Sequence, residues 1–226
     1  MQPWLLGPLD SNVDDEKEPF REKQVIASAL DESGFGWSLF VKTLDGSVVF
    51  EYRTSIKDSS QQTCVSVQVQ NAMKSHKWHY CCAGYDINKK KIVVSVEDVK
   101  SGERVSNETQ LPESVNTLPL EGTPLVFAAE KNETLSKLHF NGRLEDAMLY
   151  SDLALMTFKE SCSNEETAQN KNHLLAFWDF SLAMNTQTII DIGPCGLSGR
   201  LVNVPCRAMR GSQWTGDHMD WQNVYI

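Results

Sequence analysis

Few residues in this sequence have the types and spacing needed to bind a metal ion. No two of its five histidines have the i, i+4 spacing that places two ligands on one helix face; they are His76, His79, His139, His173 and His218. His218 is the best isolated candidate because Asp217 and Asp220 flank it, although a solvated loop explains the same trio. We therefore predict no metal site and no cofactor.

Residues suited to nucleophilic or acid–base catalysis also lack a motif. The sequence contains no Gly-x-Ser-x-Gly turn and no phosphate-binding glycine loop. Asp179 and Asp191 would have to pair across neighbouring strands to act as the acid and base of a glycosidase, and no further acidic motif supports that pair. The sequence predicts no catalytic residue.

The cysteines lack the Cys-x-x-Cys separation of zinc and redox motifs; they are Cys64, Cys81, Cys82, Cys162, Cys195 and Cys206. Free, partly buried thiols in a reducing compartment and one or two disulfides both remain open. If a disulfide forms, we expect it between Cys195 and Cys206, because Gly196 and Gly199 let the short intervening chain fold back.

The net charge of −9 argues against a nucleic-acid partner, since a polyanion would be repelled. No stretch approaches the roughly 20 apolar residues of a membrane span. The N-terminus also lacks the basic-then-apolar order of a signal peptide. We expect a cytoplasmic protein without a membrane partner.

Alternation of apolar and polar residues with a period of two indicates most of the strands. It runs from Gly36 to Lys42, where Asp45-Gly46 then forms a turn and residues 48–53 return as the second arm of a hairpin. Lys89-Lys90-Lys91 is typical of a solvated hairpin tip. Similar patterns or short apolar runs predict strands at residues 64–70, 77–85, 92–97, 125–129, 138–141, 146–150 and 174–180.

Helical periodicity is confined to residues 151–160, and residues 10–23 and 160–172 are predicted loops. Many short strands without alternating helices favour an all-β fold, with two packed antiparallel sheets in one domain of residues 1–203. We expect the core to contain apolar residues from most strands: Trp37, Leu39, Val65, Val67, Val94, Val96, Phe140 and Phe177.

Three segments, in order along the chain, resemble jelly-roll domains of the concanavalin A and laminin-G type. The first contains Lys77-Trp78-His79-Tyr80, the second contains Phe140-Asn141-Gly142, and the third runs from Leu175 to Asp191. In the second segment Asn141-Gly142 predicts a sharp turn. The resemblance implies a concanavalin A-like (LamG) jelly-roll sandwich of two antiparallel sheets.

Residues 190–221 resemble the N,N-dimethylformamidase large (beta) subunit where its concanavalin-like domain leads into the catalytic domain. The resemblance lies in Ile190-Asp191-Ile192-Gly193-Pro194, Trp214-Thr215-Gly216 and Asp220-Trp221, whereas Cys195 and Cys206 depart from the family pattern. This family is an iron-dependent amidohydrolase whose ferric ion is held by two tyrosines and a glutamate. The resemblance places those ligands in a catalytic domain that would begin after Trp221, so none is carried over.

We therefore expect a non-catalytic structural or interaction module of a dimethylformamidase-like amidohydrolase, and not an enzyme by itself. Residues 204–226 would form a tail that leads to the catalytic domain or contacts a second subunit. Its arginine and apolar side chains are the candidate interface residues: Arg207, Met209, Arg210, Trp214, Trp221 and Tyr225. The alternative is an independent module that binds carbohydrate on an exposed aromatic ring.

Overall fold

The computed structural model describes residues 2–3, 22–56, 62–75, 77–86, 88–115, 123–132, 135–151 and 173–202. All regular elements in these ranges are strands, and the pairs of named strands are antiparallel, which confirms the predicted all-β class. No helix capable of spanning a membrane occurs in this part of the chain. The chain divides into two compact units, Met1–Arg143 and Leu144–Ile226.

The first unit contains a five-stranded sheet, a three-stranded sheet and two small two-stranded pairs. The larger sheet has the order β5-β4-β3-β2-β9, formed by β5 (Gln62–Val69), β4 (Val48–Ser55), β3 (Gly36–Lys42), β2 (Lys23–Leu30) and β9 (Leu125–Phe127). The smaller sheet has the order β6-β7-β8, formed by β6 (His79–Asp86), β7 (Lys91–Asp98) and β8 (Arg104–Gln110). The pairs are β1 (Gln2–Pro3) with β12 (Gly142–Arg143), and β10 (Glu130–Asn132) with β11 (Leu135–Lys137).

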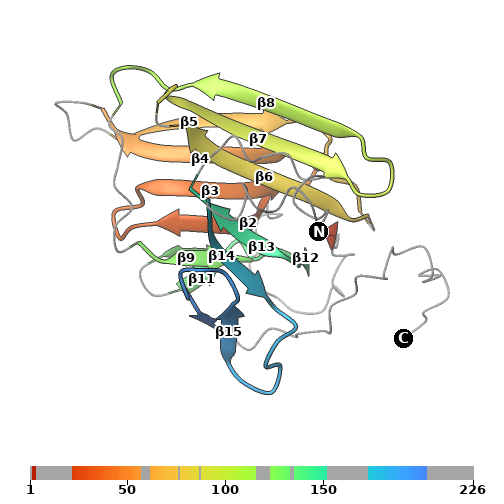
Figure 1. Cartoon of the computed structure of the whole chain (residues 1–226). Helices are drawn as coiled ribbons and strands as arrows, with labels where there is room; N and C mark the ends of the chain where they lie inside the picture. The colour runs from red at the N-terminus through yellow and green to blue at the C-terminus, as the bar shows by residue number, and fades with distance from the viewer. Residues whose placement is uncertain are drawn as a thin grey trace, which may run out of the picture. The chain divides into compact units, whose positions relative to one another are not determined.

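These two larger sheets face each other as layers (Figure 1). The ring of Tyr52 in β4 stacks on that of Tyr85 in β6, with centroids 5.5 Å apart. At the side of the layers, Asn107 Nδ2 in β8 donates to the carbonyl oxygen of Gln68 in β5 over 3.0 Å. The arrangement is consistent with the predicted β-sandwich, because side chains on the facing sides of both sheets are removed from water.

The hairpin predicted at Asp45-Gly46 is confirmed. Lys42 N donates to Ser47 O over 2.8 Å, and the Asp45 carboxylate accepts from Ser47 N over 2.9 Å. Gly46 has a φ of 68°, and a Cβ there would lie 2.1 Å from Met73 O, so the turn needs glycine. The second predicted hairpin is also present, because β6 and β7 pair along their whole length on either side of Lys89 and Lys90.

Besides β8, the long element that the sequence patterns did not predict is strand β2. It lies between β3 and β9, and seven of its eight residues are buried. Residues 138–141, in contrast, were predicted as a strand and do not form one. Leu138 instead accepts a hydrogen bond from Val25 N over 2.8 Å and packs on the cluster of Val25, Phe40 and Val49. This segment covers the outer side of the sheet.

Most of the predicted core residues are buried: Leu39, Val67, Val94, Val96 and Phe140. Trp37, Val65 and Phe177 are only half-buried. Val65 lies on β5, which is the edge strand of its sheet, so no neighbouring strand covers its outer flank.

The second unit contains a four-stranded sheet in sequence order: β13 (Ala147–Tyr150), β14 (Leu174–Asp179), β15 (Thr188–Asp191) and β16 (Gly199–Arg200). The strands predicted at 146–150 and 174–180 are thereby confirmed. Trp178 is 5% exposed, and its Nε1 donates to Leu197 O over 2.7 Å. The predicted helix at 151–160 lies beyond the described residues except for Ser151, and so does the predicted domain boundary at 203/204.

Candidate functional site

The outer side of the five-stranded sheet carries a connected group of charged side chains. Because successive side chains of a strand point to opposite faces, Glu51 and Arg53 of β4 point away from Phe50 and Tyr52. Tyr52 faces the other sheet, where it stacks on Tyr85. Glu51 and Arg53 therefore lie on the outer face, together with charged residues from β2 and β10.

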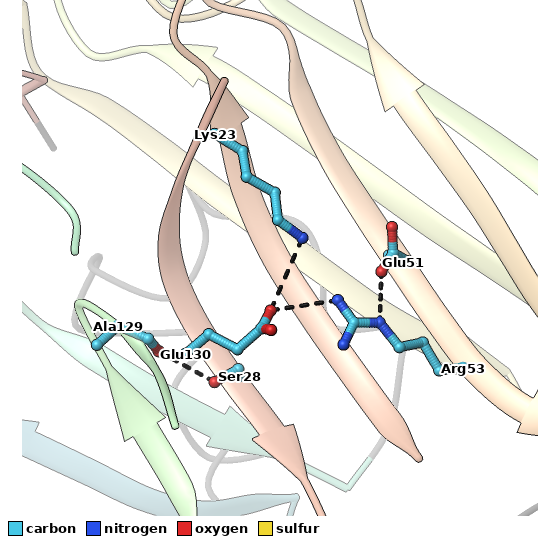
Figure 2. A network of polar contacts seen from close by, with 6 residues as sticks. All are labelled: Lys23, Ser28, Glu51, Arg53, Ala129 and Glu130. Atoms are coloured by element: carbon cyan, nitrogen blue, oxygen red, sulfur yellow. Dashed lines mark hydrogen bonds and ion pairs between the residues drawn. The ribbon is translucent and has the colours of Figure 1, made fainter. Parts of the chain in front are cut away.

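Glu130 of β10 holds this group together, as Figure 2 shows. Its Oε2 lies 3.2 Å from Arg53 Nη2 and 3.7 Å from Lys23 Nζ. Arg53 Nε also donates to Glu51 Oε1 over 2.6 Å. The Glu130 side chain is 6% exposed, so its charge is largely removed from water and depends on these cations.

The group holds two carboxylates and two cations, so it is close to neutral overall. Burial alone would lower the pKa of the Arg53 guanidinium, but the neighbouring carboxylates of Glu51 and Glu130 raise it above its ordinary value. Each carboxylate is engaged by at least one cation. The arrangement acts as an ionic clamp that joins β2, β4 and β10.

The cysteine thiols near these sheets are poor nucleophiles. Cys64 is exposed, but partial burial of its thiol raises the pKa to about 11, and the Glu51 carboxylate adds to the effect. Burial raises the pKa of the Cys81 and Cys82 thiols to about 12. All three thiols are protonated at neutral pH, whereas nucleophilic attack and metal binding require the thiolate.

In the second unit, the carboxylate of Asp191 organises the turn that follows β15. Its Oδ1 accepts from Phe177 N over 2.8 Å and from Gly193 N over 2.7 Å, and its Oδ2 accepts from Leu197 N over 2.6 Å. Burial alone would raise the pKa of the Asp191 carboxyl, but the three N–H donors hold it below its ordinary value. Both oxygens are used, so the role of this carboxylate is structural.

Gly193 allows this turn to approach β14 closely. A Cβ at Gly193 would lie 2.8 Å from both Ala176 Cα and Phe177 N, which are backbone atoms. The turn presents Ile192 and Leu197 to solvent, with exposed fractions of 50% and 49%. It is therefore a well-anchored turn with apolar side chains at its surface.

Asp179 and Asp191 do not pair across their two strands. In β14 and β15, Trp178 lies opposite Asp191 and Asp179 lies opposite Ile190. Asp179 and Asp191 consequently point to opposite faces of the sheet. Trp178 is buried, so its ring does not provide an exposed platform for a sugar.

The three histidines within the described ranges have different surroundings. His79 is buried and its Nε2 accepts from Lys74 N over 3.4 Å, His139 is exposed, and His173 Nδ1 lies 3.5 Å from Ser151 Oγ. Within the described ranges, no three His, Cys, Asp or Glu side chains are grouped as metal ligands. His76, His218, Cys206 and the six predicted interface residues lie outside those ranges.

Sequence patterns missed both polar groups. Glu51 and Arg53 alternate with Phe50 and Tyr52, which is a local sign of a charged outer face. Asp191 is followed two residues later by Gly193, a spacing typical of a turn in which an aspartate accepts from the backbone. Neither sign reveals the distant partners, which lie on other strands.

No family model matches the chain. It is similar to the N,N-dimethylformamidase beta subunit of an Alcaligenes species, with 28% identity over 219 residues. The similarity covers 88% of this chain and 28% of that subunit, so the chain spans little more than a quarter of the relative's length. The resemblance inferred from the sequence is thus supported as a distant similarity.

Proposed function

We propose that this chain is a non-catalytic β-sandwich module of the concanavalin A/laminin-G type within a dimethylformamidase-like amidohydrolase. The observation that carries the proposal is the extent of similarity, which reaches over 88% of this chain and 28% of the relative. In this assignment residues 1–203 form a jelly roll, and residues 204–226 lead to a catalytic domain or contact a second subunit. The assembly would be cytoplasmic.

Exposed apolar residues at the end of the described chain support an interaction role. Ile192, Leu197 and Val202 are 50%, 49% and 58% exposed, and they directly precede the tail. Exposed apolar side chains that gather into one patch are typical of protein interfaces. The tail supplies tryptophan and arginine, the residue types that most often dominate binding energy.

The first prediction concerns catalysis. The purified 226-residue chain should release no dimethylamine from N,N-dimethylformamide, with or without added iron(III), because its role is to bind and position a catalytic region. Amine release measured beside the related Alcaligenes enzyme as a positive control tests this. Hydrolysis by the chain that disappears on iron chelation would contradict the proposal.

The second prediction concerns the tail. Replacing both Trp214 and Trp221 by alanine should weaken binding to the catalytic region of the related beta subunit by about 100-fold, since buried tryptophans often dominate interfaces. The measurement is the affinity of each variant for that region, produced as a separate chain. Leu44→Ala is the matched control, because Leu44 is 83% exposed in the β3–β4 turn, and it should bind like the unchanged chain.

Circular dichroism should first establish that the double variant is folded. Equal affinities of the double variant and the Leu44→Ala control would show that the tail is not the interface.

A further inference from the structure

Strand β8 is the outer strand of the three-stranded sheet, and it is unusually accessible. Six of its seven residues are exposed. Val105 lies opposite Val96, which is 3% exposed on the side facing the other sheet, yet Val105 itself is 48% exposed. The strand contains no proline, the residue that commonly protects sheet edges from pairing. An apolar side chain of the inner face therefore remains open to water at this edge.

The hydrogen bonds at the two ends of β8 determine which backbone groups point outward. Leu111 N donates to Lys90 O over 2.7 Å, and Asp98 N donates to Glu103 O over 3.0 Å. Antiparallel strands alternate bonded and non-bonded pairs, so odd-numbered residues of β8 bond to β7. Arg104, Ser106 and Glu108 consequently direct their N–H and C=O groups to the outer edge.

The position of the Glu108 amide agrees with this assignment. Glu108 N donates over 2.9 Å to Asn107 Oδ1, so its acceptor is a side-chain oxygen and not a carbonyl oxygen of β7. Asn107 also reaches Gln68 O of β5 through its Nδ2. The outer edge of β8 is thus a row of backbone N–H and C=O groups. Among them, the Glu108 amide is bonded to the side chain of the preceding residue.

The charges of β8 are self-complementary. If two copies of the strand run antiparallel with Ser106 opposite Ser106, Arg104 of each copy lies opposite Glu108 of the other. A register centred on Asn107 would instead place Arg104 opposite Gln110 and bring no charged pair directly together. Opposite charges on facing residues stabilise a sheet, so they select the first register. It also covers Val105 with Asn107 of the second copy.

We propose that β8 pairs antiparallel with β8 of a second copy of this chain, centred on Ser106, and joins two three-stranded sheets into one. The contact is symmetric, with the same surface on both copies. Arg104 remains near Ser95, to whose Oγ its Nε donates over 2.8 Å, and Glu108 remains near Lys91. The dimer is independent of the proposed amidohydrolase assembly, because it uses no residue of the tail.

Replacing Ser106 by proline tests the pairing. The Ser106 amide points outward, so proline removes an intermolecular donor and adds a ring at the centre of the contact, while the β7 bonds remain. Sedimentation equilibrium of the 226-residue chain should show a concentration-dependent dimer, whose dissociation constant rises by at least about tenfold in Ser106→Pro. Ser106→Thr keeps the amide and should dimerise like the unchanged chain.

Charge exchange provides a second test that does not depend on the folding of the proline variant. Arg104→Glu and Glu108→Arg should each weaken the dimer by placing like charges opposite each other, and the double exchange should restore it. An unchanged chain that stays monomeric, or a folded Ser106→Pro variant that dimerises equally well, would overturn the proposal. Weakening by Ser106→Pro without rescue by the double exchange would overturn the register centred on Ser106.

Discussion

Replacing Asp191 by alanine is expected to lower the free energy of unfolding of the Leu144–Ile226 unit by about 3–5 kcal/mol. The substitution removes the charged acceptor of Phe177 N, Gly193 N and Leu197 N, and leaves three backbone donors without it. Hydrogen bonds to a carboxylate are stronger than neutral ones, and partly buried donors that lose their acceptor are costly. Urea unfolding followed by tryptophan fluorescence measures the loss, because Trp178 packs beside this turn.

Asp31 offers a matched control for this prediction. Its carboxylate accepts from Ser33 N and Phe35 N, both over 2.9 Å, in an exposed turn. Asp31→Ala should therefore cost about 1 kcal/mol, since water can replace the lost acceptor. If Asp31→Ala and Asp191→Ala lower the free energy of unfolding by similar amounts, the hydrogen bonds of Asp191 contribute no more than those of a carboxylate in an exposed turn.

The contribution of Asp191 to stability depends on pH, because folding lowers the pKa of its carboxyl group. The pKa of Asp191 is lower in the folded protein than the ordinary value of 3.8. Its contribution is thus present above pH of about 4 and is lost as the pH falls toward the folded-state pKa. The stability difference between the unchanged chain and Asp191→Asn should shrink on acidification below pH of about 4.

Glu130→Ala is expected to destabilise the Met1–Arg143 unit by about 3 kcal/mol. It leaves Arg53 and Lys23 without the buried carboxylate that both contact, at 3.2 Å and 3.7 Å. Removing one partner of a buried ion pair is costly, and the side chains of Lys23 and Arg53 are only 25% and 19% exposed, although Arg53 keeps its bond to Glu51. Thermal or urea unfolding at neutral pH provides the measurement.

An exposed ion pair in the same unit provides the control for Glu130→Ala. Lys77 Nζ lies 3.3 Å from Asp98 Oδ2, and the Lys77 side chain is 46% exposed. Lys77→Ala should change the free energy of unfolding by less than about 1 kcal/mol. A Glu130→Ala variant as stable as Lys77→Ala would mean that the clamp does not hold β2, β4 and β10 together.

The sequence by itself determined the all-β class and the local hairpins. Alternation along β3, β4, β5 and β7 is visible in single strands, because a strand with one side in a core must place apolar residues at every second position. The Asp45-Gly46 turn is equally local, since its backbone conformation and its capping carboxylate come from adjacent residues. These features required no knowledge of distant partners.

Strand β2 was missed because its burial has a tertiary origin. Apolar and polar residues alternate only weakly in this strand, because apolar Ile26 lies between Val25 and Ala27. The strand is buried on both sides because β3 and β9 flank it in the sheet, while Leu138 covers Val25. A single strand cannot reveal neighbours that come from residues about a hundred positions later.

Only the tertiary structure brings together the ionic clamp around Glu130 and the hydrogen bonds of Asp191. Arg53 and Glu130 are 77 residues apart, and their contact exists only because β10 is brought to the outer side of the sheet. Asp191 reaches the Phe177 amide because β14 and β15 pair with Trp178 opposite Asp191, which also directs Asp179 to the other face. Local patterns specify strands and turns, whereas the choice of partner and register depends on packing that one segment cannot encode.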